Sequence, residues 1–189
     1  MLSTRTSEKI YLKTYKNFKD KYPQWMHVFN TPISMLSNDL YPCGLSNQKA
    51  TRLKGILEKI IADFGSLNLE NLKSYNDDEL ENYLISLPGV GLKMARCIML
   101  YSFDRASLPV DTHTRRISKR LGLIQGDENE KTVHTKLDQI IPSNLRFSYH
   151  VNCLCHGREV CKSRSPLCHV CNITKYCKNF SHQKSFYKA

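Results

Sequence analysis

The sequence predicts an all-α fold, and three observations support this expectation. Apolar residues recur at spacings of three and four along most of the 189-residue chain, which is the period of an amphipathic helix. Capping residues precede many of these segments, and glycine or proline follows them. No two segments show the alternation and tight turn that predict paired strands. With 41% hydrophobic residues and a mean hydropathy of −0.44, the composition is that of a globular protein with its own core.

Four helices are expected in the first half of the chain, over residues 11–22, 30–37, 46–65 and 76–87. The first carries an aromatic stripe that should face the core, formed by Tyr11, Tyr15, Phe18 and Tyr22. The third helix is expected to begin at a Ser46 cap and to end at Gly65. The fourth opens with Asn76 and Glu79, which have the spacing of a capping box.

Four further helices are expected in the second half, over residues 90–103, 111–122, 128–141 and 144–157. Asp111 is placed to cap the second of these helices, and Gly122 is placed to end it. The third should end before Pro142, which cannot continue a helix. A cysteine-rich loop follows the last helix, and the chain beyond it is expected to fray.

The chain is strongly basic, with a formal net charge of +11 and a pI of about 9.3. Nucleic acid is the commonest partner of such a protein, although a solvated basic surface gives the same charge. Charged residues interrupt the start of the chain, so no signal peptide is predicted. No apolar run approaches the ~20 residues that span a bilayer. A cytoplasmic, nucleoid-associated protein without a membrane partner is therefore expected.

The segment LPGVG, residues 87–91, lies between two amphipathic segments and predicts a helix-hairpin-helix. Pro88, Gly89 and Gly91 break the helix and allow a tight turn. The glycines leave room for a phosphate near the backbone N–H groups of the turn and the next helix. Such a contact positions DNA without reading its sequence. Gly89, Val90 and Gly91 are therefore candidate DNA-binding residues.

Lys93 lies in the first turn of the helix after this hairpin, where unpaired N–H groups favour an anion over an ammonium. A lysine that loses its proton there is a candidate nucleophile. Asp111 begins the next helix, so its carboxylate can accept that proton or stabilise a positive sugar. On its own, Asp111 is more commonly an ordinary helix cap. Together on a DNA-binding platform, the two predict cleavage of an N-glycosidic bond, followed by strand scission through a Schiff base.

Four of the eight cysteines have the spacing C-x6-C-x2-C-x5-C, at Cys161, Cys168, Cys171 and Cys177. A secreted disulfide framework would spread its cysteines more evenly, so metal ligation is expected. Zinc sites usually present two close pairs of ligands, and here only Cys168 and Cys171 form one. Four thiolates at uneven spacing also hold iron–sulfur clusters. The spacing alone leaves both groups open and favours the cluster.

The segments LPGVGLKMA, VDTHTRRISKRLGL and HGREVC, followed by this cysteine spacing, resemble the endonuclease III branch of the helix-hairpin-helix DNA glycosylases. The resemblance covers about residues 2–178. It implies a six-helix domain with the hairpin, a [4Fe-4S] cluster on the four cysteines, and double-stranded DNA bound between the two domains. It places Lys93 on the family's catalytic lysine and Asp111 on its catalytic aspartate.

The resemblance also implies residues that contact the distorted duplex. LSTRTS places Arg5 where a side chain enters the gap left by a flipped base, and CGLSNQKA places Leu45 as a wedge in the opposite strand. His113, two residues after Asp111, is a further candidate DNA contact. Arg5 and GLSNQKA are closer to the thymine- and uracil-mismatch glycosylases of the family, some of which carry tyrosine where this chain has Lys93.

The expected function is base excision repair by a monomeric DNA glycosylase with AP lyase activity. Its expected substrate is duplex DNA with a lesion, mismatch or abasic site, and its expected target is a damaged or mispaired pyrimidine. Two alternatives stay open. One is a monofunctional thymine or uracil mismatch glycosylase in which Asp111 directs a water, and the other is a non-catalytic DNA-binding module.

Two domains are expected, a helix-hairpin-helix domain over residues 1–125 and a domain of C-terminal helices and cluster loop over residues 126–189. The family carries a terminal helix and a long apolar helix before the LSTRTS position, where this chain begins. The first domain is therefore expected to be N-terminally incomplete and to expose an apolar groove.

Overall fold

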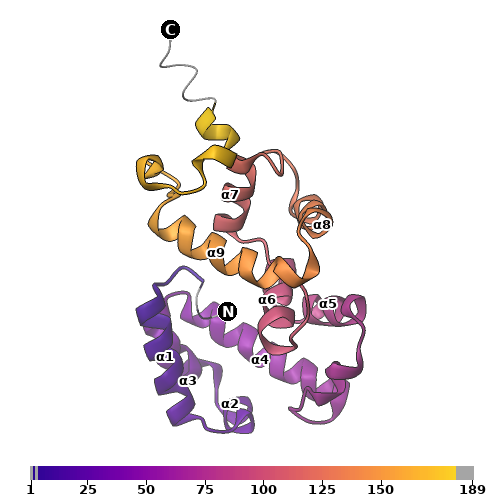
Figure 1. Ribbon diagram of the computed structural model, residues 1–189. Helices are drawn as coiled ribbons and strands as arrows, with labels where there is room; N and C mark the ends of the chain where they lie inside the picture. The colour runs from indigo at the N-terminus through magenta and orange to yellow at the C-terminus, as the bar shows by residue number, and fades with distance from the viewer. Residues whose placement is uncertain (1, 3, 182–189) are drawn as a thin grey trace. The chain divides into compact units, whose positions relative to one another are not determined.

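The computed structural model describes residue 2 and residues 4–181, and every regular element within them is helical (Figure 1). The prediction of an all-α fold is confirmed. The α-helices are α1 (Glu8–Lys21), α2 (Trp25–Asn30), α3 (Ile33–Leu40), α4 (Ser46–Phe64), α5 (Asp77–Ser86), α6 (Leu92–Ser102), α7 (Thr112–Leu121), α8 (Glu130–Ile140) and α9 (Arg146–Glu159). Short 3-10 turns lie at Tyr41–Cys43, Glu70–Ser74, Ser143–Leu145, Cys168–Val170 and Thr174–Tyr176. None of the helices described is long and apolar enough to cross a membrane.

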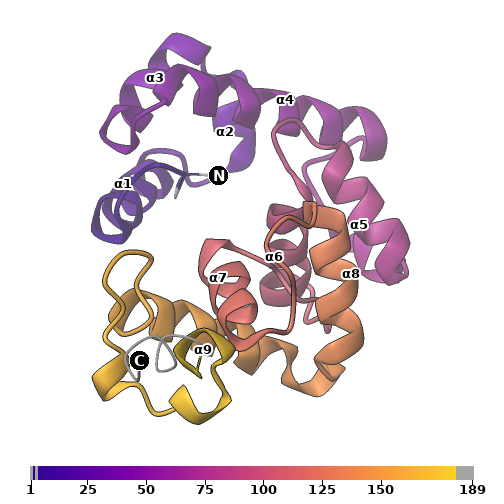
Figure 2. The same ribbon diagram turned by 90° about the horizontal axis from the view of Figure 1, so that it is seen from above.

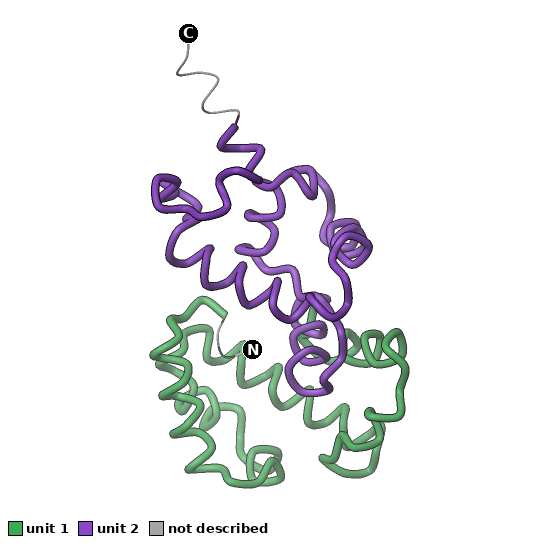
Figure 3. Tube along the Cα trace, in the orientation of Figure 1, with its two compact units in different colours: residues 1–91 green, residues 92–189 purple. Residues whose placement is uncertain are grey.

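The chain forms two compact units, residues 1–91 and residues 92–189 (Figure 3). The first contains α1 to α5 and the turn of the predicted hairpin. The second contains α6 to α9 and the cysteine loop. This division by compactness lies at a different place from the boundary after residue 125, which concerns the family's domain organisation and stays a prediction.

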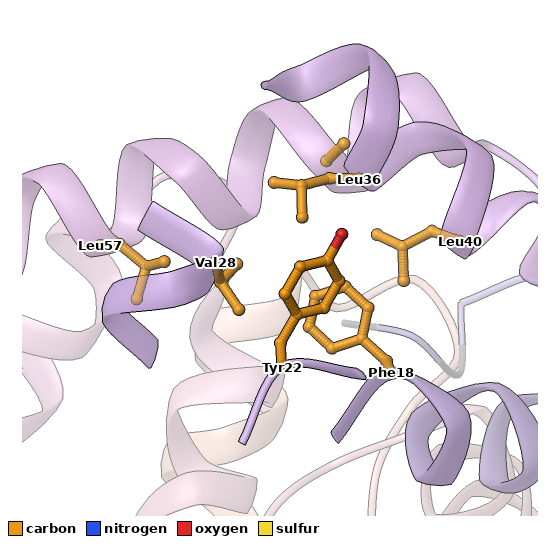
Figure 4. Packing of buried hydrophobic residues seen from close by; sticks show 7 residues of the cluster. Phe18, Tyr22, Val28, Leu36, Leu40 and Leu57 are labelled. Carbon is orange, nitrogen blue, oxygen red and sulfur yellow. The ribbon is translucent and has the colours of Figure 1, made fainter. Parts of the chain in front are cut away.

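The core of the first unit gathers side chains from its first four helices (Figure 4). Its buried members are Phe18, Tyr22, Val28, Leu36, Leu40, Ala50 and Leu57. The rings of Phe18 and Tyr22 have centroids 4.9 Å apart, and the Tyr22 hydroxyl donates a 2.7 Å hydrogen bond to Asp39. The predicted aromatic stripe is thus core-facing only at its C-terminal end, because Tyr15 is exposed and Tyr11 is half-buried.

The helix caps follow most of the sequence signals. Asn76 and Glu79 form the predicted capping box, with reciprocal 2.9 Å hydrogen bonds. Gly65 ends α4 with φ +70°, as expected for the left-handed position. The prediction of a Ser46 cap is wrong, since Leu45 holds the cap position and Ser46 is the first helical residue. The Ser46 hydroxyl instead lies 3.1 Å from that of Ser37 and does not cap its own helix.

The first unit also carries an apolar groove with an empty volume of about 810 Å³. Its lining residues are Leu2, Tyr11, Leu12, Tyr15, Phe18, Trp25, Leu40 and Leu53. The groove agrees with the expected apolar surface, while the expectation about helices preceding LSTRTS stays a prediction. Nothing in the structure shows what covers it.

The core of the second unit is formed by Leu108, Val110, Ile124, Val133, Leu137 and Ile141. Beside it, α7 and α9 lie against each other (Figures 1 and 2). Gly157 on α9 permits this close approach, because a Cβ there would lie 2.5 Å from the His113 ring on α7. Arg116 fastens the pair by donating a 2.8 Å hydrogen bond to the Gly157 carbonyl. This packing places the start of α7 against α9 within the second unit.

Candidate active site

The turn of the predicted hairpin, residues 87–91, has the conformation that its sequence requires. Gly89 has φ +75°, a region that other residues rarely adopt, and the Val90 amide donates a 3.0 Å bond to the Leu87 carbonyl. Val90 is buried and anchors the turn, while Gly91 is exposed. The turn therefore presents its glycines outward and its valine inward.

Arg52 on α4 lies against this turn, and the sequence did not point to it. A Cβ on Gly89 would come within 2.4 Å of the Arg52 side chain, so a larger residue would displace Arg52 in addition to straining the φ angle. Pro88 packs in the same way against Gly55, one turn further along α4. A guanidinium thus lies next to the backbone that was predicted to bind phosphate. Within the long helical pattern of residues 46–65, nothing marks Arg52 as different from an ordinary surface arginine.

Lys93 and Asp111 both lie in the second unit and act on the same neighbours. Lys93 is exposed in the first turn of α6, and the half-buried Asp111 caps α7 by accepting a 2.7 Å hydrogen bond from the Thr114 amide. Cys97 lies one turn after Lys93 on α6 and feels both charges. Burial raises the pKa of the Cys97 thiol, Lys93 lowers it by charge and a hydrogen bond, and Asp111 raises it. The ammonium and the carboxylate therefore share one neighbourhood.

His150 on α9 lies at the base of this neighbourhood and is 2% exposed. Its Nδ1 lies 3.0 Å from the carbonyl of Pro109, two residues before Asp111, which makes that nitrogen the hydrogen-bond donor. Burial lowers the pKa of His150, and the nearby Asp111 carboxylate opposes this effect. The neutral imidazole fixes the backbone that leads into the α7 cap. Neither His150 nor Cys97 carried a signal in the sequence, because both sit in ordinary helical patterns.

His113 is half-buried in the first turn of α7 and turned toward α9. Its Nδ1 lies 3.1 Å from the Arg116 guanidinium, and its ring contacts the position where Gly157 lacks a side chain. The structure therefore gives His113 a packing role between α7 and α9. Its predicted contact with DNA stays a prediction.

Arg5 and Leu45, the two residues expected to enter the duplex, both lie in the first unit with positive φ. Their φ angles are +54° and +52°, a conformation that costs a non-glycine residue of the order of 1–2 kcal/mol. Both are exposed, Leu45 with 43% of its surface accessible. An exposed leucine held in a strained conformation is poorly explained by folding alone. Strain of this kind is concentrated at functional sites.

The four clustered cysteines line one pocket in the second unit, with an empty volume of about 430 Å³. Burial raises the pKa of Cys168, and the three other thiols raise it further. Among the residues described, no group of three or more histidine, cysteine or acidic side chains is arranged to hold a single metal ion. The structure thus brings the predicted ligands to one apolar pocket, which also contains Ile117, Val160 and Leu167.

The C-terminal end of α7 is bound to this cysteine loop. The Arg120 guanidinium donates to Cys161 Sγ at 3.0 Å and to the Lys162 carbonyl at 2.8 Å, and Cys177 Sγ lies 3.4 Å from the Arg120 carbonyl. One turn earlier, Arg116 donates a 2.9 Å bond to the Cys161 carbonyl. Cysteine ligates metals as the thiolate, and a cationic donor beside one of these sulfurs is compatible with that charge. The donor set and its surroundings therefore suit a thiolate-held group.

Comparison with known proteins shows the family to which the chain belongs. Residues 1–143 match the family described as "HhH-GPD superfamily base excision DNA repair protein". Endonuclease III of Buchnera aphidicola is 31% identical over 185 residues, covering 94% of this chain and 78% of that protein. Endonuclease III of Sulfolobus acidocaldarius is 32% identical over 148 residues, covering 78% and 64% of the two chains. Protein ROS1A of rice is 26% identical over 183 residues, which are 88% of this chain but only 9% of ROS1A.

Solved structures share the fold over nearly the whole chain. A non-covalent endonuclease III–DNA complex superposes with a TM-score of 0.83 at 27% identity, covering 97% of this chain and 82% of that one. A thermostable thymine-DNA glycosylase superposes with a TM-score of 0.81 at 24% identity, covering 96% and 81% of the two chains, and supports the fold alone. The chain therefore spans most of these compact structures but a small part of the long plant relative.

Proposed function

Because the chain belongs to the HhH-GPD superfamily of base excision DNA repair proteins, we propose that it is a DNA glycosylase with AP lyase activity. The proposed substrate is duplex DNA with a damaged or mispaired base, in the first place a pyrimidine, or with an abasic site. The observation that carries the proposal is the common neighbourhood of Lys93 and Asp111. The charges of Lys93 and Asp111 both affect the pKa of Cys97 and of His150, which supports assigning the amine and the carboxylate to one sugar.

In the proposed reaction, the neutral Lys93 amine attacks C1′ of the deoxyribose. The bond between C1′ and the base breaks, and its electron pair leaves with the base, which takes up a proton. Asp111 accepts the proton that the lysine loses and stabilises the positive charge that develops on the sugar. Its position at the α7 N-terminus is fixed by the hydrogen bond that it accepts from the Thr114 amide.

The C1′–O4′ bond then breaks and O4′ takes up a proton, which opens the sugar and leaves a Schiff base between C1′ and the Lys93 nitrogen. Loss of a proton from C2′ then expels the phosphate on the 3′ side, which nicks the strand. Hydrolysis of the Schiff base returns Lys93 as a free amine. The exposed position of Lys93 suits this role, since the nucleophile must reach a base that has left the helical stack.

The proposed partner is duplex DNA, bound by a monomer wherever the cell keeps its DNA. The formal charge of +11 supplies the sequence-independent part of the affinity. The Gly89–Gly91 turn and Arg52 are the proposed phosphate contacts, and Arg5 and Leu45 the proposed insertions into the duplex. His113 is retained as a candidate contact in spite of its packing role.

We propose that Cys161, Cys168, Cys171 and Cys177 hold a [4Fe-4S] cluster. The four side chains line a single pocket, and Arg120 donates to one of the sulfurs. When bound, the cluster cross-links the loop through four metal–thiolate bonds. The chain's own contribution is to bury the sulfurs and to supply Arg116 and Arg120, which bind the loop to α7.

Borohydride trapping tests the lyase proposal. Reduction of the Schiff base during turnover should link the chain covalently to a lesion-bearing or abasic duplex, visible as a slower band in a denaturing gel. Lys93→Ala should abolish the linked band, whereas Lys131→Ala, which removes an exposed lysine of α8, should leave it unchanged. The absence of any linked product with abasic DNA, or an equal yield from Lys93→Ala, would contradict the lyase step.

A second candidate function is a monofunctional mismatch glycosylase, which is favoured by the likeness of Arg5 and GLSNQKA to the mismatch glycosylases of the family. In that reaction Asp111 directs a water at C1′, and Lys93 only binds phosphate. Lys93→Gln separates the two functions. It should abolish both base release and nicking if Lys93 is the nucleophile, and it should retain base release if a water attacks.

A further inference from the structure

We propose that Lys49 is the positioning residue for both insertions into the duplex, because its buried ammonium binds the backbone of the two loops that carry Arg5 and Leu45. The inference rests on the proposed function, since it assigns Arg5 and Leu45 the role of entering DNA. It adds a residue that touches neither DNA nor the reacting atoms. It also predicts that the two insertions act as one unit.

The Lys49 side chain lies on α4, inside the first unit, and is 2% exposed. Its Nζ donates three hydrogen bonds, all to backbone carbonyls: Leu2 at 2.9 Å, Thr4 at 2.9 Å and Cys43 at 2.8 Å. An ammonium has three N–H donors, so every one of them is used. The three acceptors are neutral, which makes this a charge-assisted network without a counter-charge.

Burying such a charge is unfavourable unless its bonds are made. Desolvation lowers the pKa of Lys49, which records the cost of removing the ammonium from water. An apolar residue would fill the same space on α4 without that cost. A lysine at this position is therefore better explained by the loops that it holds than by the stability of the helix.

The carbonyls that Lys49 binds lie one to three residues before the two strained residues. Thr4 precedes Arg5, and Cys43 lies two residues before Leu45. Arg5 and Leu45 have nearly equal positive φ angles, +54° and +52°. A strained conformation persists only where the surroundings hold it, and here the same ammonium holds the residues leading into both. Loss of the Lys49 bonds would free the two loops together.

A double-mutant cycle on DNA binding tests this coupling. The probe is a duplex that contains a tetrahydrofuran abasic analogue, which cannot form a Schiff base, and the reference is the same duplex undamaged. The measured quantity is the ratio of the two dissociation constants. In the unaltered chain, Arg5→Ala and Leu45→Ala should each reduce this preference by about tenfold. In the Lys49→Met background each should reduce it further by less than about twofold.

Lys54→Met is the matched control. Lys54 lies on the same helix and donates to the Phe29 carbonyl, away from both loops. It should leave the preference and the effects of Arg5→Ala and Leu45→Ala unchanged. Full additivity of either substitution with Lys49→Met overturns the proposal. A lack of any preference for the analogue in the unaltered chain is a different result, which defeats the proposed function itself.

Thermal unfolding and circular dichroism show whether Lys49→Met folds. If it does not, Lys49→Gln keeps two donors on a neutral side chain and replaces it in the cycle. Effects of Arg5→Ala and Leu45→Ala that are as large in the Lys49→Gln background as in the unaltered chain overturn the proposal as well.

Discussion

Asp111 caps α7 by accepting a hydrogen bond from the Thr114 amide, and it is also the proposed catalytic carboxylate. Its charge, like that of Lys93, affects the pKa of Cys97 and of His150. The sequence could not separate a cap from a catalytic group, because aspartate is common in both. A substitution that keeps the helix cap but removes the carboxylate tests the two roles separately.

Asp111→Asn should leave stability nearly unchanged and abolish most of the activity. Asparagine caps helices about as well as aspartate, so the free energy of unfolding should change by less than about 0.5 kcal/mol. The amide cannot accept the lysine proton, so base excision should slow by about 10²-fold or more. Urea unfolding and single-turnover excision are the two measurements. A large loss of stability with retained excision would make Asp111 only a cap.

Leu45→Gly should stabilise the chain and weaken its function. Glycine adopts φ +52° without strain, so the free energy of unfolding should rise by about 1 kcal/mol, less the lost contacts of an exposed side chain. The same change removes the proposed wedge, so the preference for an abasic duplex should fall. Gly44→Ala is a useful contrast. It places a side chain at φ +64° in open space and should destabilise without removing a wedge.

Some residues of the proposed site can be identified from the sequence alone, and others cannot. Lys93, Asp111 and the cysteines stand in motifs with unusual composition or spacing. Lys49 and Arg52 stand in an ordinary amphipathic helix, where Lys49 binds the carbonyls of Leu2 and Thr4 and Arg52 lies beside Gly89, all distant in the sequence. A hydrogen bond to a carbonyl leaves no pattern in the residue that supplies it. Such residues emerge only when the chain is folded.

At the scale of elements, hydrophobic periodicity and capping residues predict where the helices lie. They predict the first residue of each helix less accurately. Capping boxes and terminal glycines act within a few residues, so Asn76, Gly65 and Gly122 were predicted correctly. Leu45 holds the cap position of α4 in place of Ser46, and the loop before it is bound by Lys49 through the Cys43 carbonyl, a contact that Ser46 itself gives no sign of. How far the aromatic residues of α1 are buried also depends on which other helices pack against them, which the sequence of α1 does not show.

The cysteine loop has little regular structure of its own, with two short 3-10 turns at Cys168–Val170 and Thr174–Tyr176. Its order should therefore depend on the proposed cluster. Cys168→Ser should lower the iron content from about four atoms per chain and reduce the brown colour of the purified protein. The control Cys155→Ser removes an exposed thiol of α9 that lies outside the cysteine pocket. Equal iron in both variants, or zinc in place of iron, would contradict the cluster.

At the scale of the whole molecule, the affinity for DNA should depend on salt. The net charge of +11 and the number of DNA phosphates that the protein contacts determine how strongly. With about five phosphate contacts, affinity for an undamaged duplex should fall with a log–log slope near −4.5 in salt concentration. Arg52→Gln should reduce the magnitude of that slope by about one, because it removes the guanidinium beside the hairpin turn.

Lys73→Gln is the control for this measurement, because it removes the same charge from a lysine that forms an ion pair with Glu70 on the short turn Glu70–Ser74. Fluorescence anisotropy over a range of potassium chloride concentrations gives the slopes. An equal change in both variants would show that Arg52 contributes only net charge and makes no contact with a phosphate.

Because α7 connects Asp111 to the cysteine loop, oxidation of that loop should affect the proposed active site. Asp111 caps one end of this ten-residue helix, and the other end donates to a cysteine of the loop, a span of about 15 Å. Oxidation of the cysteine sulfurs would weaken the contact between Arg120 and Cys161 at the C-terminal end of α7. The helix that carries Asp111 at its N-terminal end would then be held less firmly. A cell under oxidative stress would then lose repair capacity at the moment when its genome accumulates lesions, unless the loop is rebuilt.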